Sequence, residues 1–158
     1  MLTSCYNGDR INSLKGTKGR RRMDVGFAVL ADYASLSQEG KLNVLGIFGE
    51  INPPQLPFAL PMMYLVLAYE AGVAEIGTDK IVRIVLLDSD GKQLLGLEQT
   101  NKVPQAKRPG SRVSVNHLIG LAGIRFDHAG DYAFSVLIGG EEKKSVPLRV
   151  NEPAKGGS

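Results

Sequence analysis

The feature that most constrains this chain is a strict alternation of apolar residues near its C-terminus. Four of them occupy every second position: Tyr132, Phe134, Val136 and Ile138. In an extended strand such positions share one face. Gly139-Gly140 follows, a pair that tolerates the positive φ of a tight turn, and alternate apolar residues return through 146–150. The pattern predicts a β-hairpin, with Tyr132 where a tyrosine corner ties a loop to a strand in immunoglobulin-like sandwiches.

Similar short apolar segments, separated by turn residues, recur along most of the chain. Besides the terminal hairpin, strands are predicted at 25–31, 41–48, 62–70, 80–87, 92–99 and 111–119. Asp88-Ser89-Asp90-Gly91 predicts a hairpin turn, because aspartate accepts bonds from nearby amides and glycine takes a left-handed conformation.

Prolines and polar residues predict long loops at 52–61 and 101–110, because proline donates no amide hydrogen to a sheet. Residues 71–77 form a further loop with room for one turn of helix. About eight strands with no substantial helix predict an all-β fold, an antiparallel β-sandwich that is immunoglobulin-like or C2/jelly-roll-like. These architectures differ in connectivity, which alternation does not determine.

The first predicted strand, 25–31, differs from the others because it is almost continuously apolar. Such a run is expected for a strand covered on both faces or docked deep in a sandwich. The same two-sided character of Val25–Leu30 suggests a homodimer formed through a strand edge.

Charge divides the chain into a basic N-terminal segment and a slightly acidic body. Residues 1–22 contain six Lys or Arg residues and one Asp, whereas the whole chain has a net charge of +3, so the rest carries −2. We therefore expect 1–22 to be a disordered basic tail, or a mis-annotated leader with Met23 as the physiological start. Residues 23–151 form a single predicted domain, and 152–158 a flexible tail.

The predicted compartment and the predicted lack of catalysis rest mainly on residue types and motifs that are scarce in the chain. Cys5 is the single cysteine, and no apolar run has the length of a membrane span or of a secretory signal core. We expect a cytoplasmic protein. Because no nucleophile elbow, phosphate-binding glycine loop or Rossmann fingerprint occurs, we expect neither an enzyme nor a cofactor.

Several motifs resemble a widespread bacterial family of small proteins that is known as a domain of unknown function. They are Leu30-Ala31-Asp32-Tyr33-Ala34, the segments 38–43 and 46–48, Leu86-Leu87-Asp88-Ser89-Asp90-Gly91, and Gly130-Asp131-Tyr132-Ala133-Phe134 after Phe126. The resemblance covers about residues 23–150. It implies a compact bacterial β domain and brings no catalytic residue with it.

Two polar features are the candidates for chemistry. Asp127, His128 and Asp131 lie in one loop, and Asp88 could join them from another, giving a tentative polar loop site. Transition metals usually require three or four ligands at defined spacing, so a plain loop is the stronger interpretation and no metal is expected. His117 lies on an apolar strand face, where a core-edge histidine with one hydrogen bond is expected.

The function favoured by these observations is a non-catalytic interaction or assembly module with an unidentified protein partner, or a homo-oligomer. Tentative partner contacts are the apolar residues Leu56, Phe58 and Leu60, taken as exposed, and the basic pair Lys107 and Arg108. The alternative is a small-ligand-binding protein or enzyme built around the polar loop site. Residues 10–22 could also attract nucleic acid or anionic lipid weakly.

Overall fold

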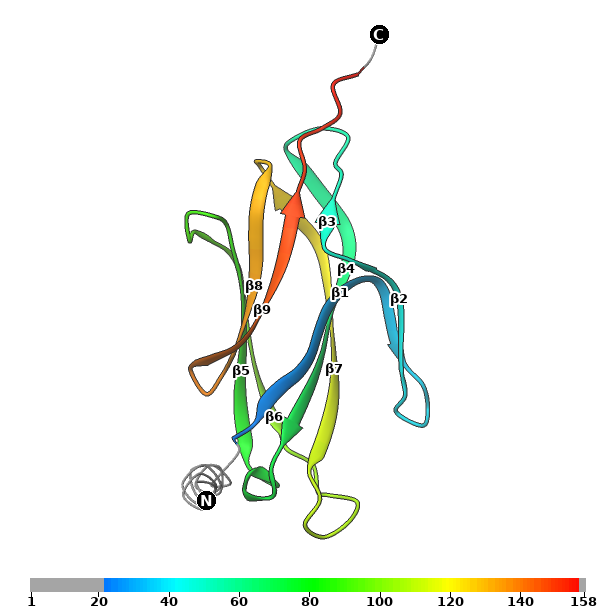
Figure 1. Cartoon of the computed structure of the whole chain (residues 1–158), viewed down its shortest axis with the longest axis vertical. Coiled ribbons are helices and arrows are strands. Elements are labelled where there is room, and N and C mark those ends of the chain that lie inside the picture. The colour runs from blue at the N-terminus through cyan, green and yellow to red at the C-terminus, as the bar shows by residue number, and fades with distance from the viewer. Residues whose placement is uncertain (1–21, 157–158) are drawn as a thin grey trace, which may run out of the picture.

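The structure, a computed structural model, describes residues 22–156. These residues form nine β-strands and one short 3-10 helix (Figure 1). Their bounds are β1 (Asp24–Leu36), β2 (Leu42–Phe48), β3 (Glu50–Ile51), β4 (Phe58–Ala71), η2 (Val73–Glu75), β5 (Asp79–Leu87), β6 (Gln93–Lys102), β7 (Val113–Phe126), β8 (Gly130–Ile138) and β9 (Glu141–Val150). The predicted basic tail lies outside the described residues except for Arg22, and so does Cys5.

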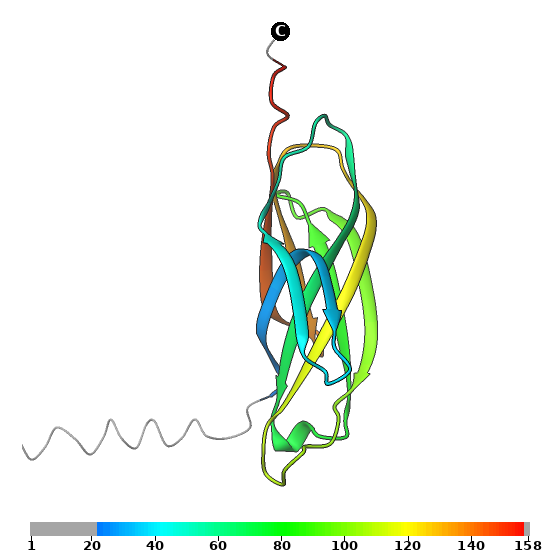
Figure 2. The same ribbon diagram turned by 90° about the vertical axis from the view of Figure 1, so that its right-hand side faces the viewer.

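The strands form two facing sheets, so the predicted β-sandwich is confirmed (Figures 1 and 2). One sheet has the order β2-β1-β4-β7 and the other β3-β9-β8-β5-β6. The strands β1, β4 and β7 correspond to A, B and E of an immunoglobulin domain, and β6, β5, β8 and β9 to C′, C, F and G. Connectivity therefore selects the immunoglobulin-like alternative. The predicted turn of helix is also present, as η2.

The main core lies between the sheets and takes inward side chains from both. Its largest fully buried members are Tyr69, Phe126, Phe134, Leu30, Met63, Leu65, Leu67, Leu86 and Leu148. The predicted alternation is confirmed in β8, where Phe134 and Val136 are 0% exposed. Each such side chain contributes roughly 1.5–3 kcal/mol through its burial.

Local turn chemistry places the strands of the second sheet as predicted. Gly139 and Gly140 have φ of 60° and 83° and join β8 to β9. In the β5–β6 turn, the Asp88 carboxylate accepts hydrogen bonds from the amides of Asp90 and Lys92 at 2.9 and 2.8 Å. The predicted tyrosine corner is present too, because the Tyr132 hydroxyl donates to the His128 carbonyl at 2.7 Å.

Three predicted boundaries are wrong in the four-stranded sheet. Strand β1, predicted over 25–31, continues to Leu36, where it pairs with β2. Strand β4 begins at Phe58 and includes Pro61, which was expected in a loop, and β7 continues past Ile119 to Phe126. The extensions of β4 and β7 pair with each other, whereas β1 reaches β4 only as far as Tyr64. Pro61 is tolerated because this part of β4 has a partner on one side only, where a missing amide donor leaves no second ladder incomplete.

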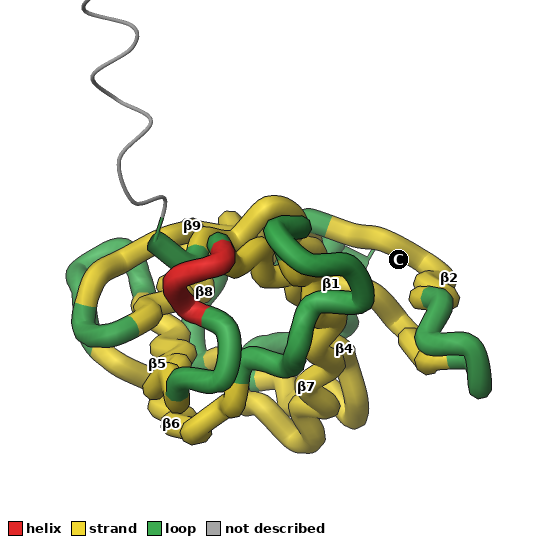
Figure 3. The backbone as a smooth tube through the Cα atoms, turned by 90° about the horizontal axis from the view of Figure 1, so that it is seen from below, coloured by secondary structure: helices red, strands yellow, loops and turns green. Residues whose placement is uncertain are grey.

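Strand β1 changes partner along its length. Residues 24–31 pair with β4, and Leu30–Leu36 pair with β2. The end of β1 and the whole of β2, residues 32–48, therefore form a hairpin, here called the arm, that extends beyond the pairing with β4 (Figures 1 and 3). The arm packs Ala34, Leu42 and Val44 against Val66, Tyr64 and Leu118, and the Asn116 side chain of β7 donates to the Gly40 carbonyl at 3.4 Å. Gly46 in the arm has φ of 68°, and a Cβ there would lie 2.3 Å from a carboxylate oxygen of Asp32, so the position requires glycine.

Candidate functional site

The outward side of the four-stranded sheet is lined by apolar residues from all four strands. Strand register places on this side Phe27, Val29, Ala31 and Tyr33 of β1, Leu45 and Ile47 of β2, Met62, Tyr64 and Val66 of β4, and Leu118 of β7. We call these ten residues the apolar face. Cross-strand neighbours connect them, since Val29 is opposite Val66, Val66 is opposite Leu118, and Tyr33 is opposite Leu45.

Five large side chains of the apolar face are open to solvent. Their exposed fractions are 38% for Phe27, 49% for Tyr33, 64% for Leu45, 61% for Ile47 and 47% for Met62. The Tyr33 and Tyr64 rings meet edge to face with centroids 5.7 Å apart, which links the arm to β4. Contiguous exposed apolar surface of this kind marks an interaction site more often than an ordinary monomer surface.

The centre of the apolar face is packed. Val66 and Ala31 are 0% exposed although they point outward, and with Ala34 they form a second, small core supported by Val29, Tyr64 and Leu118. None of the ten residues is charged; Glu70, farther along β4, pairs with Arg112 at 3.1 Å. The face is thus an ordered, uncharged platform.

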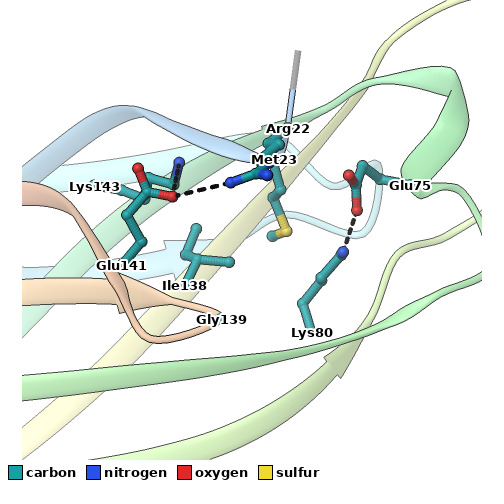
Figure 4. Close-up of a pocket in the computed structure, with 8 residues that line it drawn as sticks. All are labelled: Arg22, Met23, Glu75, Lys80, Ile138, Gly139, Glu141 and Lys143. Atoms are coloured by element: carbon teal, nitrogen blue, oxygen red, sulfur yellow. Dashed lines mark ion pairs between the residues drawn. The ribbon is translucent and has the colours of Figure 1, made fainter. Parts of the chain in front are cut away.

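A pocket of about 210 Å³ lies between η2 and the β8–β9 turn (Figure 4). Met23, Ile138 and Gly139 line it together with Arg22, Lys80, Lys143, Glu75 and Glu141. Arg22 and Lys143 lie 3.7 and 3.2 Å from the same Glu141 carboxylate oxygen, and Lys80 pairs with Glu75. Each cation that lines the pocket therefore already has an acidic partner, so the arrangement serves the folded chain without a ligand.

The predicted polar loop site is brought together only in part. Asp88, His128 and Asp131 line one hollow of about 210 Å³, whereas Asp127 is not among its lining residues. Asp127 instead accepts a hydrogen bond from Arg125 at 2.7 Å, and this bond lowers the pKa of its carboxyl group. Asp131 pairs with Arg149 at 2.8 Å, and Asp88 holds its own turn. The carboxylates are therefore occupied by local contacts.

The tentative partner contacts are neither together nor all exposed. Leu56, Phe58 and Leu60 are half-buried and pack against the main core, so their expected exposure is wrong. The reason is that β4 starts at Phe58 and aligns these side chains with the sandwich. Lys107 and Arg108 are exposed in the β6–β7 loop, at the opposite end of the sandwich from the β3–β4 connection (Figure 1).

Sequence reasoning assigned no role to Tyr33, Leu45, Ile47 and Met62. A usable signal was present, because 25–31 and 41–48 are apolar on both faces and one sandwich core can cover only one.

His117 is a core-edge histidine, as expected. Its Nδ1 lies 3.2 Å from the Tyr69 hydroxyl oxygen, within hydrogen-bond distance, and the Asn101 amide nitrogen lies 3.5 Å from the same atom. Burial lowers the pKa of His117 and raises that of Tyr69. The group joins β4, β6 and β7 at the edge of the core, where His117 is half-buried.

A family model described as "Family of unknown function (DUF6941)" matches residues 26–151. The chain belongs to this family. The expected resemblance to a family of unknown function is thereby confirmed for DUF6941, and the match covers the sandwich. The comparison with curated proteins finds no match.

Two solved structures are similar in fold to this DUF6941 protein. One is the Pseudomonas fluorescens alkylpurine DNA glycosylase AlkC bound to DNA containing an abasic site analog, with 14% identity and a TM-score of 0.44; 90% of this chain is covered but only 34% of that one. The other is an immunoglobulin-like protein from Pseudomonas aeruginosa, with 12% identity, a TM-score of 0.41, and coverage of 84% and 99%. Within residues 22–156, no helix has the length and apolar character needed to cross a membrane.

Proposed function

We propose that this DUF6941 protein is a non-catalytic interaction module that binds another protein chain through the apolar face. The observation that carries the proposal is a set of five solvent-exposed, uncharged large side chains on one sheet, Phe27, Tyr33, Leu45, Ile47 and Met62, arranged around a packed centre. A sequence such as 25–31 is typical of a strand covered on both sides, yet Phe27 remains 38% exposed. A partner would provide the second cover.

The polar groups support a non-catalytic role. Asp88 accepts turn amides, Asp131 pairs with Arg149, and Asp127 pairs with Arg125. A catalytic carboxylate needs a free position beside a reacting atom and an environment that adjusts its pKa to the task. Asp88 and Asp131, which line the hollow at His128, are therefore already held in local contacts.

The cellular setting is part of the proposal. A single cysteine, Cys5, is consistent with a bacterial cytoplasm, where thiols stay reduced and partners are met in solution.

Site-specific photo-crosslinking in cells of the native host tests this function. A photo-reactive amino acid is placed at Ile47 on the apolar face and, as a matched control, at Ile81. The two side chains have similar exposed fractions, 61% for Ile47 and 50% for Ile81. Ile81 lies on β5 of the other sheet. We expect a discrete protein adduct from position 47 and none from position 81. No adduct from position 47, or the same adducts from both, would contradict the proposal.

A further inference from the structure

We infer that the chain covering the apolar face is a second copy of this protein, packed face to face about a two-fold axis. This rests on the proposed function and names its partner. Three properties of the apolar face support it: neutrality, area, and the shape of the neighbouring strand edge.

Neutrality makes the apolar face self-complementary. In an isologous interface each patch meets an identical patch, so any charge near the axis would face its own copy. None of the ten residues of the apolar face is charged. Two copies can therefore pack these ten residues together without setting a charge of the face opposite itself. The neighbouring outward charges Glu70 and Arg112 pair with each other at 3.1 Å.

The exposed area is sufficient for a specific contact. With roughly 200 Å² for a fully exposed large side chain, fractions of 38–64% over five residues leave on the order of 500 Å² uncovered. Two such faces would bury on the order of 1,000 Å² from these side chains alone, which is where specific interfaces begin.

The free edge of β2 is unsuited to strand pairing, which favours contact through the face. Gly46 interrupts this strand with φ of 68°, and no register partner for it is formed on β1 between Leu45 and Ile47. An irregularity of this kind twists an edge away from further ladder formation. The side chains of Leu45 and Ile47 on either side remain 64% and 61% exposed and are available to a facing sheet.

Sedimentation velocity of the full 158-residue chain, between about 1 and 100 µM where a micromolar dimer dissociates, tests the inference. The variant Ile47→Lys places a charge in the interface, and Ile81→Lys is the control on the five-stranded sheet. We expect a dimer for the unmodified chain and for Ile81→Lys. Ile47→Lys should weaken dimerisation roughly 100-fold or more. Leu45→Thr, which retains β propensity, gives a second, milder variant should Ile47→Lys fail to fold.

The outcomes separate this inference from the function on which it rests. A chain that stays monomeric at all concentrations, or a dimer unaffected by both Ile47→Lys and Leu45→Thr, overturns the dimer. So does equal dissociation by Ile81→Lys. If the chain is monomeric and position 47 crosslinks to a different protein, the proposed interaction function is supported and the proposed dimer is rejected. If position 47 gives no adduct, both the interaction function and the dimer are rejected. A crosslinked adduct with twice the mass of the chain supports both.

Discussion

The outward sides of the two sheets follow the same alternation but differ in chemistry, although apolar residues such as Ile81 and Val85 also lie on the outward side of the five-stranded sheet. On the five-stranded sheet, Arg83 of β5 is directly opposite Glu98 of β6, and Asp131 of β8 is opposite Arg149 of β9. On the four-stranded sheet the corresponding cross-strand pairs are Tyr33 with Leu45 and Val29 with Val66. Opposite charges and apolar side chains both stabilise cross-strand pairs, but only the first kind suits water.

The difference separates the inward side chains, which form the main core, from the outward side chains, which are available for contacts with other molecules. Inward residues of both sheets are mostly apolar and close one core, with His117 and Asn101 at its edge. The apolar face is therefore surplus to the main core, although Val66 and Ala31 give it a small core of its own.

The largest expected effect comes from a charge at the centre of the apolar face. Val66→Asp should lower the free energy of unfolding by roughly 3–5 kcal/mol, because Val66 is 0% exposed and the carboxylate would be buried unpaired. Urea denaturation measures the loss. The control Ile81→Asp, on the 50% exposed Ile81, should change stability by less than about 0.5 kcal/mol. Equal losses would remove the distinction between the packed and the open outward positions.

A smaller effect is expected on the polar side of the comparison. Ser135, 5% exposed, donates its hydroxyl hydrogen to the carboxylate of Glu142. Ser135→Ala should lower the free energy of unfolding by about 1 kcal/mol, since the exposed glutamate can rebind water. Ser114→Ala, at an exposed outward position of β7, is the matched control and should be nearly neutral. Denaturant melts that do not distinguish the two variants would argue against a stabilising polar contact on this face.

A modest pH dependence is expected on the inward side of the four-stranded sheet. Burial lowers the pKa of His117 below its ordinary 6.5, so the unfolded chain binds the proton more readily. The stability that neutral His117 contributes is complete above pH 6.5 and is lost as the pH falls from there toward the folded pKa. Urea midpoints measured across this range should fall less steeply in His117→Gln. An unchanged slope would mean that other groups set the acid sensitivity.

The smallest effect on folding should come from the exposed tip of the apolar face. Leu45 is 64% exposed, so Leu45→Thr should change the free energy of unfolding by less than about 0.5 kcal/mol in a dilute sample where the chain is monomeric. A loss comparable to that of a core substitution would mean that Leu45 serves the fold of one chain, and the comparison of the two faces would then lose its functional meaning.

Local chemistry made much of the five-stranded sheet predictable from the sequence. Gly139-Gly140 and Asp88–Gly91 bring their flanking strands together within a few residues, and the Tyr132 corner bonds to a residue four positions away. Such contacts depend on neighbours along the chain, so the residues that make them can be read in order. The core positions of β8 followed from the same alternation.

The four-stranded sheet and the candidate site were less predictable because their contacts are remote in sequence. Pro61 is accommodated only because β1 stops pairing at Tyr64, and Leu60 becomes a core contact because β4 meets β7, some sixty residues later. The Asp127–Arg125 pair is an exception, because it joins residues only two positions apart and spacing alone did not indicate it.

The sequence by itself determined that this chain alternates into strands, where its tight turns fall, and that 25–31 is apolar on both sides. Only the tertiary structure decided which of those two sides the sandwich covers. The physical reason is that periodicity assigns residues to faces, whereas burial depends on which distant strand arrives opposite each face. In this protein a second sheet arrives opposite one face of β1, whereas on the other face Ala31 is packed and Phe27 and Tyr33 stay exposed.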